Sequence, residues 1–175
     1  MFAVRPADRE PHQPRDATGE YTRKTAYEVS RLSSRMKGAG HPTPLGDPTS
    51  GVVLVLGQPF GPRTLEALKL SLQAVGLREA YVTYESTGLL AQEIQATEPH
   101  VLVAIGSGAA DNVDAIDYPL VRQPFSTAEP GVLFPWTKGT TGLLVPALAP
   151  VLDDDAAKRR FWRAFLALRE IAPSP

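Results

Sequence analysis

Two short loops in this sequence carry the side chains best suited to chemistry on a bound ligand. Residues 57–61 read Gly-Gln-Pro-Phe-Gly and follow an apolar run, and residues 106–108 read Gly-Ser-Gly after another apolar run. The amide of Gln58 could orient a water molecule, or it could close the loop through a hydrogen bond. The ring of Phe60 could stack on a flat ligand, or it could cover the edge of a sheet. Gln58 is therefore the one candidate for a catalytic, water-positioning role.

The ends of the apolar runs define the expected ligand site. In an open sheet of parallel strands, ligands bind beyond the carboxyl ends of the strands. The candidate ligand-binding residues at those ends are Gly57, Gln58, Phe60, Gly61, Tyr84, Ser107, Val145 and Pro146. Backbone N–H groups at 106–108 could hold a phosphate, although a tight turn between a strand and a helix explains the same glycines.

The residue types present argue against several other kinds of chemistry. The chain has no cysteine, which excludes thiolate nucleophiles, disulfides and cysteine zinc sites. Its histidines stand at 12, 41 and 100, too scattered for a Ser-His-Asp triad or a histidine metal site. The acidic run 153–155 fits the start of a helix, with Asp153 as N-cap, better than it fits a cation site. We therefore expect no metal and no cofactor.

A basic stretch near the N-terminus offers a second kind of site. Residues 20–37 carry Val29, Leu32 and Met36 at helical spacing, which predicts a helix with a narrow apolar stripe. Its cations include Arg23, Lys24, Arg31 and Arg35, and these could lie along a nucleic-acid backbone. The alternative is a solvated helix that packs on the rest of the protein through its apolar stripe.

The apolar periodicity predicts the elements that position these residues. Strands are expected at 51–57, 80–86 and 100–106, with a weaker one at 131–136 and another short apolar run at 142–145. Helices are expected from Pro62 to Gly76, over 88–98, from Ser107 onward and after Asp153. This alternation predicts an α/β fold, a three-layer α/β/α sandwich with a central, mainly parallel four-stranded sheet.

Length and composition place this architecture in a single α/β domain. The chain has 175 residues, of which 43% are hydrophobic, enough for one core. We assign 1–50 to a flexible extension that contains the basic helix, and 51–172 to the α/β domain. Residues 1–19 are rich in proline and charge and are expected to be disordered. The net charge of −1 excludes a protein that clamps DNA by charge alone. Without a signal-peptide pattern or a long apolar run, the expected location is cytoplasmic, away from membranes.

The order of these segments resembles the uracil-DNA glycosylase superfamily. The family has a strand that ends in a Gly-[Gln/Glu] loop, then a helix, a proline and a strand ending in glycine, and finally a loop before a Lys-Arg-x-x-Trp type of helix. The matching segments here are 55–61, 89–94, Pro99, 101–106, 145–148 and 157–162. The resemblance covers about 51–170 and rests on order and pattern. It implies a DNA-binding domain connected with DNA repair.

The chain departs from this family where the family's chemistry is carried out. Base excision needs a flipped base, a positioned water and stabilisation of the charge that develops on the departing base. Pro59 stands where some members have an aspartate, Tyr84 where a base-reading asparagine is expected, and Val145 where the loop histidine is expected. The resemblance therefore implies a pseudoenzyme that has lost efficient excision.

Three functions follow from these observations. The first is a glycosylase-like domain that binds nucleic acid or a nucleobase-like ligand without base excision. The second is a protein-interaction or scaffold module that docks through its N-terminal segment or the loop around Trp136. The third is an active DNA glycosylase, a hydrolase of N-glycosidic bonds, that uses atypical residues.

Overall fold

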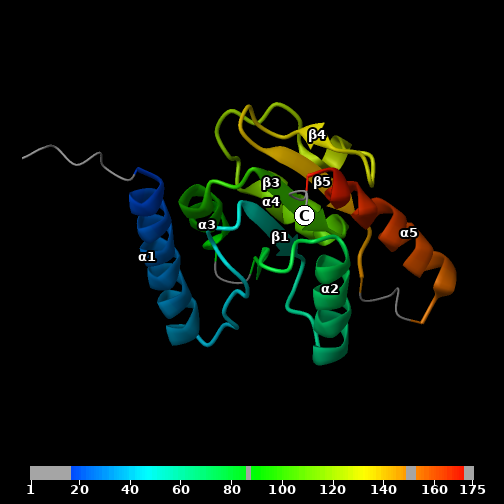
Figure 1. The fold of residues 1–175 in the computed structure, drawn as a ribbon, viewed down its shortest axis with the longest axis horizontal. Helices are drawn as coiled ribbons and strands as arrows, with labels where there is room; N and C mark the ends of the chain where they lie inside the picture. The colour runs from blue at the N-terminus through cyan, green and yellow to red at the C-terminus, as the bar shows by residue number, and fades with distance from the viewer. Residues whose placement is uncertain (1–16, 86–87, 149–152, 172–175) are drawn as a thin grey trace, which may run out of the picture.

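The computed structural model describes residues 17–85, 88–148 and 153–171 (Figure 1). Its elements are α1 (Ala17–Gly38), β1 (Val52–Leu56), α2 (Pro62–Ala74), β2 (Tyr81–Tyr84), α3 (Leu90–Thr97), β3 (Val101–Ile105), α4 (Ser107–Ala115), η1 (Phe125–Thr127), β4 (Phe134–Pro135), β5 (Thr141–Val145), α5 (Asp155–Phe165) and η3 (Leu166–Glu170). The helix expected over 20–37 is confirmed and begins three residues earlier. The disorder expected for residues 1–19 is wrong for residues 17–19, which form the first turn of α1, and residues 1–16 lie outside the described residues.

The strands form one mixed sheet in the order β2-β1-β3-β5-β4. β2, β1, β3 and β5 run parallel, and β4 pairs antiparallel with β5. The mainly parallel sheet is therefore confirmed, but the expected strand number of four is wrong. Both late segments contribute, 142–145 as the full parallel strand β5 and 131–136 only as the two-residue edge strand β4. Pro135 has no N–H to donate to a further neighbour, which suits β4 to the edge of the sheet.

Helices cover both faces of this sheet because its central strands are apolar on both sides. All five residues of β1 and all five of β3 are buried. Val53 and Val55 of β1 pack in one cluster with residues of α1, α3 and α4, whereas Leu54 packs in a second cluster with residues of α2 and α5. Figure 1 shows the same division, with α1 and α3 on one side and α2 and α5 on the other. No described helix has the length and apolar character needed to cross a membrane.

The basic helix α1 is docked on the α/β body by its apolar stripe. Val29, Leu32 and Met36 are 5%, 9% and 3% exposed and belong to the cluster on the α3 side of the sheet. The segment that follows α1 also returns to the sheet, where Leu45 and Val82 exchange two backbone hydrogen bonds of 2.9 and 2.8 Å. Residues 17–38 therefore form a helix that packs on the domain through its apolar stripe, which is one of the two arrangements expected from the sequence.

The ends of α2 match the signals in the sequence. Pro62 occupies the first turn, where its missing N–H costs nothing. Gly76 follows the C-cap residue with φ of +78°, and the N–H of Leu77 bonds to the carbonyl of Leu72 at 2.9 Å. This is the left-handed glycine stop that satisfies the last carbonyls of a helix.

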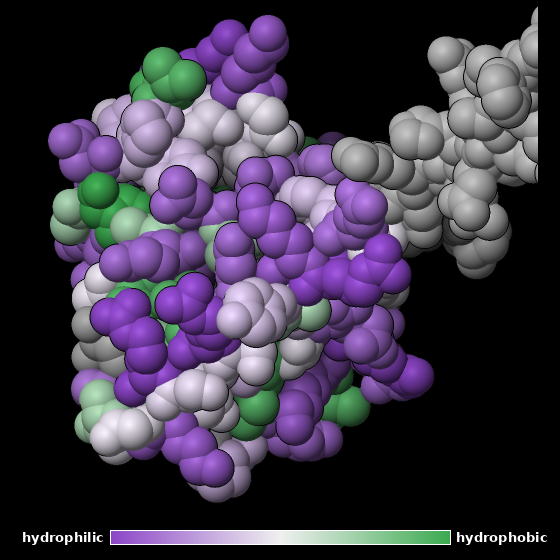
Figure 2. All heavy atoms as spheres, turned by 90° about the vertical axis from the view of Figure 1, so that its left-hand side faces the viewer, coloured by the Kyte–Doolittle hydropathy of each residue, from purple (hydrophilic) through white to green (hydrophobic). Residues whose placement is uncertain are grey.

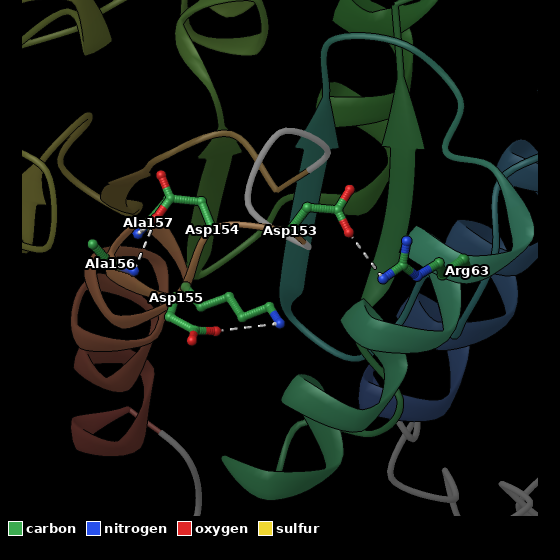
Figure 3. A network of polar contacts seen from close by, with 7 residues as sticks. Arg63, Asp153, Asp154, Asp155, Ala156 and Ala157 are labelled. Carbon is green, nitrogen blue, oxygen red and sulfur yellow. Dashed lines mark hydrogen bonds and ion pairs between the residues drawn. The ribbon is translucent and has the colours of Figure 1, made fainter.

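The N-cap of α5 is Asp154, so the expectation that Asp153 caps this helix is wrong. The carboxylate of Asp154 accepts hydrogen bonds from the N–H groups of Ala156 and Ala157 at 2.9 and 3.2 Å (Figure 3). Asp153 instead forms an ion pair of 3.4 Å with Arg63 at the start of α2. The cause is the position of the first helical turn, because the cap must lie directly before Asp155 to reach the free N–H groups.

We expect Asp154→Ala to lower the free energy of unfolding by about 1 kcal/mol, because two N–H groups of the first turn lose their acceptor. Asp153→Ala is the matched control, and its effect should be small because its ion pair is largely exposed and screened. Chemical denaturation monitored by circular dichroism measures both variants. Equal losses in the two variants would contradict the assignment of the cap.

Candidate functional site

The carboxyl ends of the four parallel strands meet at one edge of the sheet. Leu56 pairs in register with both Tyr84 and Ile105, and Ile105 pairs with Val145. The residues that follow these strands therefore start side by side. The expectation that the loops after the strands gather at one edge is confirmed.

The chain order of the strands reverses between β1 and β3, which is the position where open sheets of parallel strands bind ligands. Here the loop after β1 meets the start of α4. A Cβ atom on Gly57 would lie 3.5 Å from the amide nitrogen of Ala109, in ordinary contact. Ser107 and Gly108 of the first turn of α4 are exposed, and no side chain caps this helix. This position thus offers backbone N–H groups and small side chains.

The predicted ligand-binding residues differ in how far their side chains are exposed at this edge. Gln58 is exposed and has no hydrogen-bond partner among the described residues, so the loop-closing role considered for its amide finds no support. Phe60 is half-buried and packs on the α2 and α5 side of the core. Val145 is fully buried, and Pro146 beside it is half-buried. Gly61 is the N-cap residue of α2, so it opens that helix.

Tyr84 closes the edge beside β1 and is 8% exposed. Its hydroxyl is one of two buried side-chain polar atoms of the described residues without a hydrogen-bond partner. Burial raises the pKa of this hydroxyl, and the charge of Glu93 adds to the effect. Tyr84 is therefore a neutral phenol packed into the protein, in place of an amide that could read a base edge.

The described residues do not assemble an acid–base pair beside Gln58. The carboxylate that follows β2 is Glu85, whose Oε1 accepts a hydrogen bond of 2.6 Å from the N–H of Gly88 and so belongs to a turn. His100 precedes β3 and lies against Gly51, at the opposite end of the sheet. His12 lies outside the described residues. Within residues 17–85, 88–148 and 153–171, no group of three or more His, Asp or Glu could hold a metal ion.

A second site lies between α1 and α3, where a surface groove has a volume of about 590 Å³. The wall from α1 carries Lys24, Arg31 and Arg35, and the wall from α3 carries the amides Gln92 and Gln95. Sequence reasoning identified the cations but not their neighbours, because the packing of α1 against α3 joins segments some sixty residues apart. The face that carries α1 is hydrophilic over most of its surface (Figure 2).

The cations of this groove are not engaged in ion pairs. The two ion pairs among the described residues are Arg63–Asp153 and Lys158–Asp155, both far from α1 in the fold. Lys24, Arg31 and Arg35 are exposed and fall at i, i+7 and i+11, so helical geometry places them on one stripe. Arg23 is also exposed on α1 but does not line the groove. The groove also contains Glu28 and Glu98, two carboxylates that oppose an anionic ligand.

The α3 wall of the groove is anchored to the sheet by a buried carboxyl group that the sequence analysis missed. Glu93 is 1% exposed, and its Oε1 accepts hydrogen bonds of 2.8 Å from the hydroxyls of Tyr81 and Thr83 on β2. Its Oε2 is the second buried polar atom of the described residues that lacks a partner. The sequence did contain a sign of this burial. Glu93 stands three residues after Leu90 and four before Thr97, a spacing that places it on the buried side of the helix.

Burial raises the pKa of Glu93 to about 7, against 4.5 for an ordinary glutamate. The hydrogen bonds from Thr83 and Tyr81 act in the opposite direction, and the charge of Glu85 adds to the increase. Burial, followed by the charge of Glu93, also raises the pKa of Tyr81. The network therefore holds Glu93 as a neutral carboxylic acid at mildly acidic pH and as a buried anion at alkaline pH.

We expect this network to make the stability of the protein fall as the pH rises through about 7. Because the pKa is higher in the folded protein than in the unfolded chain, the folded state holds the proton more tightly. The stabilising contribution is complete below the unfolded value of 4.5 and is lost above the folded value. The loss should be on the order of 3 kcal/mol.

Glu93→Gln should remove this part of the pH dependence while preserving the acceptor for Tyr81 and Thr83. Urea denaturation of both proteins at about pH 5 and about pH 8 measures it. The exposed Glu66→Gln is the matched control and should keep the pH dependence of the parent. Parallel pH profiles of the parent and Glu93→Gln would contradict the raised pKa.

No protein-family model matches this chain, and no curated protein matches its sequence.

Proposed function

We propose that this chain is a uracil-DNA glycosylase-like domain that binds nucleic acid and lacks base-excision activity. The observation that carries the proposal is the stripe of three exposed, unpaired cations along the α1–α3 groove. The resemblance in segment order adds the expectation that the ligand is a nucleic acid.

The groove has the chemistry of a surface that binds a phosphate backbone. Lysine and arginine side chains that contact phosphates release condensed counterions, which supplies most of the sequence-independent affinity for nucleic acids. Helix α1 holds five cations against two carboxylates, although the whole chain has a net charge of −1. The positive charge is thus local, and α5 carries a similar excess, with four cations against one carboxylate. The amides of Gln92 and Gln95 can donate to phosphates or bases on the opposite wall.

The sheet edge supports the absence of excision. Of the three positions at which the family's chemistry is expected, two carry side chains that are nearly or fully buried, Tyr84 and Val145. The third, Pro59, has no group that could act as an acid or a base. Loss of a group that stabilises developing charge typically lowers a rate about 10²- to 10³-fold. Here more than one catalytic group is missing.

A protein-interaction module that docks through Trp136 is less well supported, because this side chain is not accessible. Trp136 is 1% exposed and stacks on Tyr118 with ring centroids 5.0 Å apart. It also lies 6.2 Å from the ring of Phe125, so it belongs to the core on the α4 side. The loop around Trp136 therefore has a structural role in the described fold.

We expect binding of fluorescent oligonucleotides that weakens steeply with salt. Replacing Lys24, Arg31 and Arg35 together by glutamine should make the slope of log affinity against log salt shallower by about 2, as expected for three lost phosphate contacts to a single strand. The matched control replaces Lys69, Arg159 and Arg160, exposed cations of α2 and α5, and should leave the slope unchanged. Absence of binding at low salt, or an equal effect of both triple variants, would overturn the proposal.

We also expect no release of uracil from uracil-containing DNA, because the described sheet edge has no acid–base pair beside Gln58. A gel assay after alkaline cleavage of abasic sites measures release from single-stranded and duplex substrates. Release that disappears in Gln58→Ala would establish the third function, an active glycosylase with atypical residues. That result would overturn the inactive assignment without affecting the binding proposal.

A further inference from the structure

The exposed aromatic side chains of the described residues gather on the basic helix. Six large hydrophobic residues are exposed, and the two aromatic ones among them are Tyr21 and Tyr27, both on α1. Tyr27 is 66% exposed and Tyr21 is 42% exposed. Neither ring stacks on another aromatic ring of the described residues. Packing of the core therefore does not explain why α1 has two tyrosines facing solvent.

The two rings lie on either side of the cation stripe. At about 100° per residue, Tyr21 and Tyr27 are displaced in opposite directions from the line that joins Lys24 and Arg31. Tyr27 stands four residues from Arg23 and four from Arg31, one helical turn in each direction. A ligand along the stripe would thus meet positive charge and a flat ring at alternating positions.

Tyr21 is held in place at the groove. It lines the groove with Lys24, and its hydroxyl donates a hydrogen bond of 3.4 Å to the backbone carbonyl of Thr97 on α3. Burial, followed by the neighbouring Glu98, raises the pKa of this hydroxyl, so the group remains a neutral donor. A ring fixed in this way loses little freedom when a ligand stacks on it.

From this arrangement we infer that the α1 face is a platform for single-stranded nucleic acid, on which unpaired bases stack against Tyr27 and Tyr21 between phosphate-binding cations. The inference rests on the proposed function and adds the class of nucleic acid. Alternating aromatic and basic side chains are the general means by which proteins hold single strands without sequence preference. In a duplex the faces of the bases are stacked inside the helix, so the same rings would have nothing to stack on.

The test compares single strands with a duplex on the full chain by fluorescence anisotropy. The probes are a thymidine oligomer, a uridine oligomer of equal length and a mixed-sequence DNA duplex. We expect both single strands to bind more tightly than the duplex at every salt concentration. A duplex that binds as tightly as the single strands, or more tightly, would overturn the inference.

Stacking and charge are separated by two substitutions. Tyr27→Ala should weaken single-strand binding about tenfold with an unchanged salt slope, whereas Tyr27→Phe, which keeps the ring, should bind like the parent. Arg31→Gln should instead make the slope shallower by about 0.7. The matched control is Leu70→Ala, an exposed apolar residue of α2 that should have no effect.

The outcomes distinguish this inference from the proposed function. If no probe binds in a salt-dependent way, the proposed function fails and the inference fails with it. If binding depends on salt but Tyr27→Ala matches the parent, the nucleic-acid function stands and the stacking platform is rejected. Because Tyr27 is largely exposed, its variants should keep the thermal stability of the parent, which circular dichroism verifies.

Discussion

The packing of α1 on α3 is the contact on which the functional face depends. Val29, Leu32 and Met36 are buried in the cluster that also contains Leu90 and Ile94 of α3. A helix has one rotation about its axis in which this stripe is buried, so the same contact decides which side chains face solvent. Burial of the apolar stripe therefore places Lys24 and Arg31 beside the amides of α3. The groove exists only when the two helices are packed together.

The position of α3 depends in turn on a carboxyl group inside the protein. Glu93 joins α3 to β2 through hydrogen bonds from the hydroxyls of Tyr81 and Thr83, which favour the charged carboxylate, whereas burial favours the neutral acid. A buried charge without a counterion is costly, because the protein interior replaces water poorly. The groove wall is thus attached to the sheet by an interaction whose strength depends on pH near neutrality.

The two candidate sites of the molecule differ in what they offer a ligand. At the sheet edge the side chains of Tyr84 and Val145 are buried in the core. The α1–α3 groove has charge, amides and the exposed ring of Tyr21, and its two helices lie on the face of the sheet that also carries α4. The proposed recognition by charge and stacking uses the side chains of the groove and requires no proton transfer.

Much of this fold could be predicted from the sequence, because its signals are local. The apolar runs of β1 and β3, the period of α1, Pro62 and Gly76 each act on a few neighbouring residues, and the alternation of strands and helices predicts a parallel sheet. The cations of α1 and the residues of the sheet edge were identified in the same way.

Long-range contacts decided the rest. The antiparallel edge strand β4 and the pairing of α1 with α3 depend on where distant segments meet. The burial of Glu93 is the clearest case. Its sequence neighbours place Glu93 on the inner side of a helix. A carboxyl group is stable there only because the folded sheet supplies two hydroxyl donors from β2.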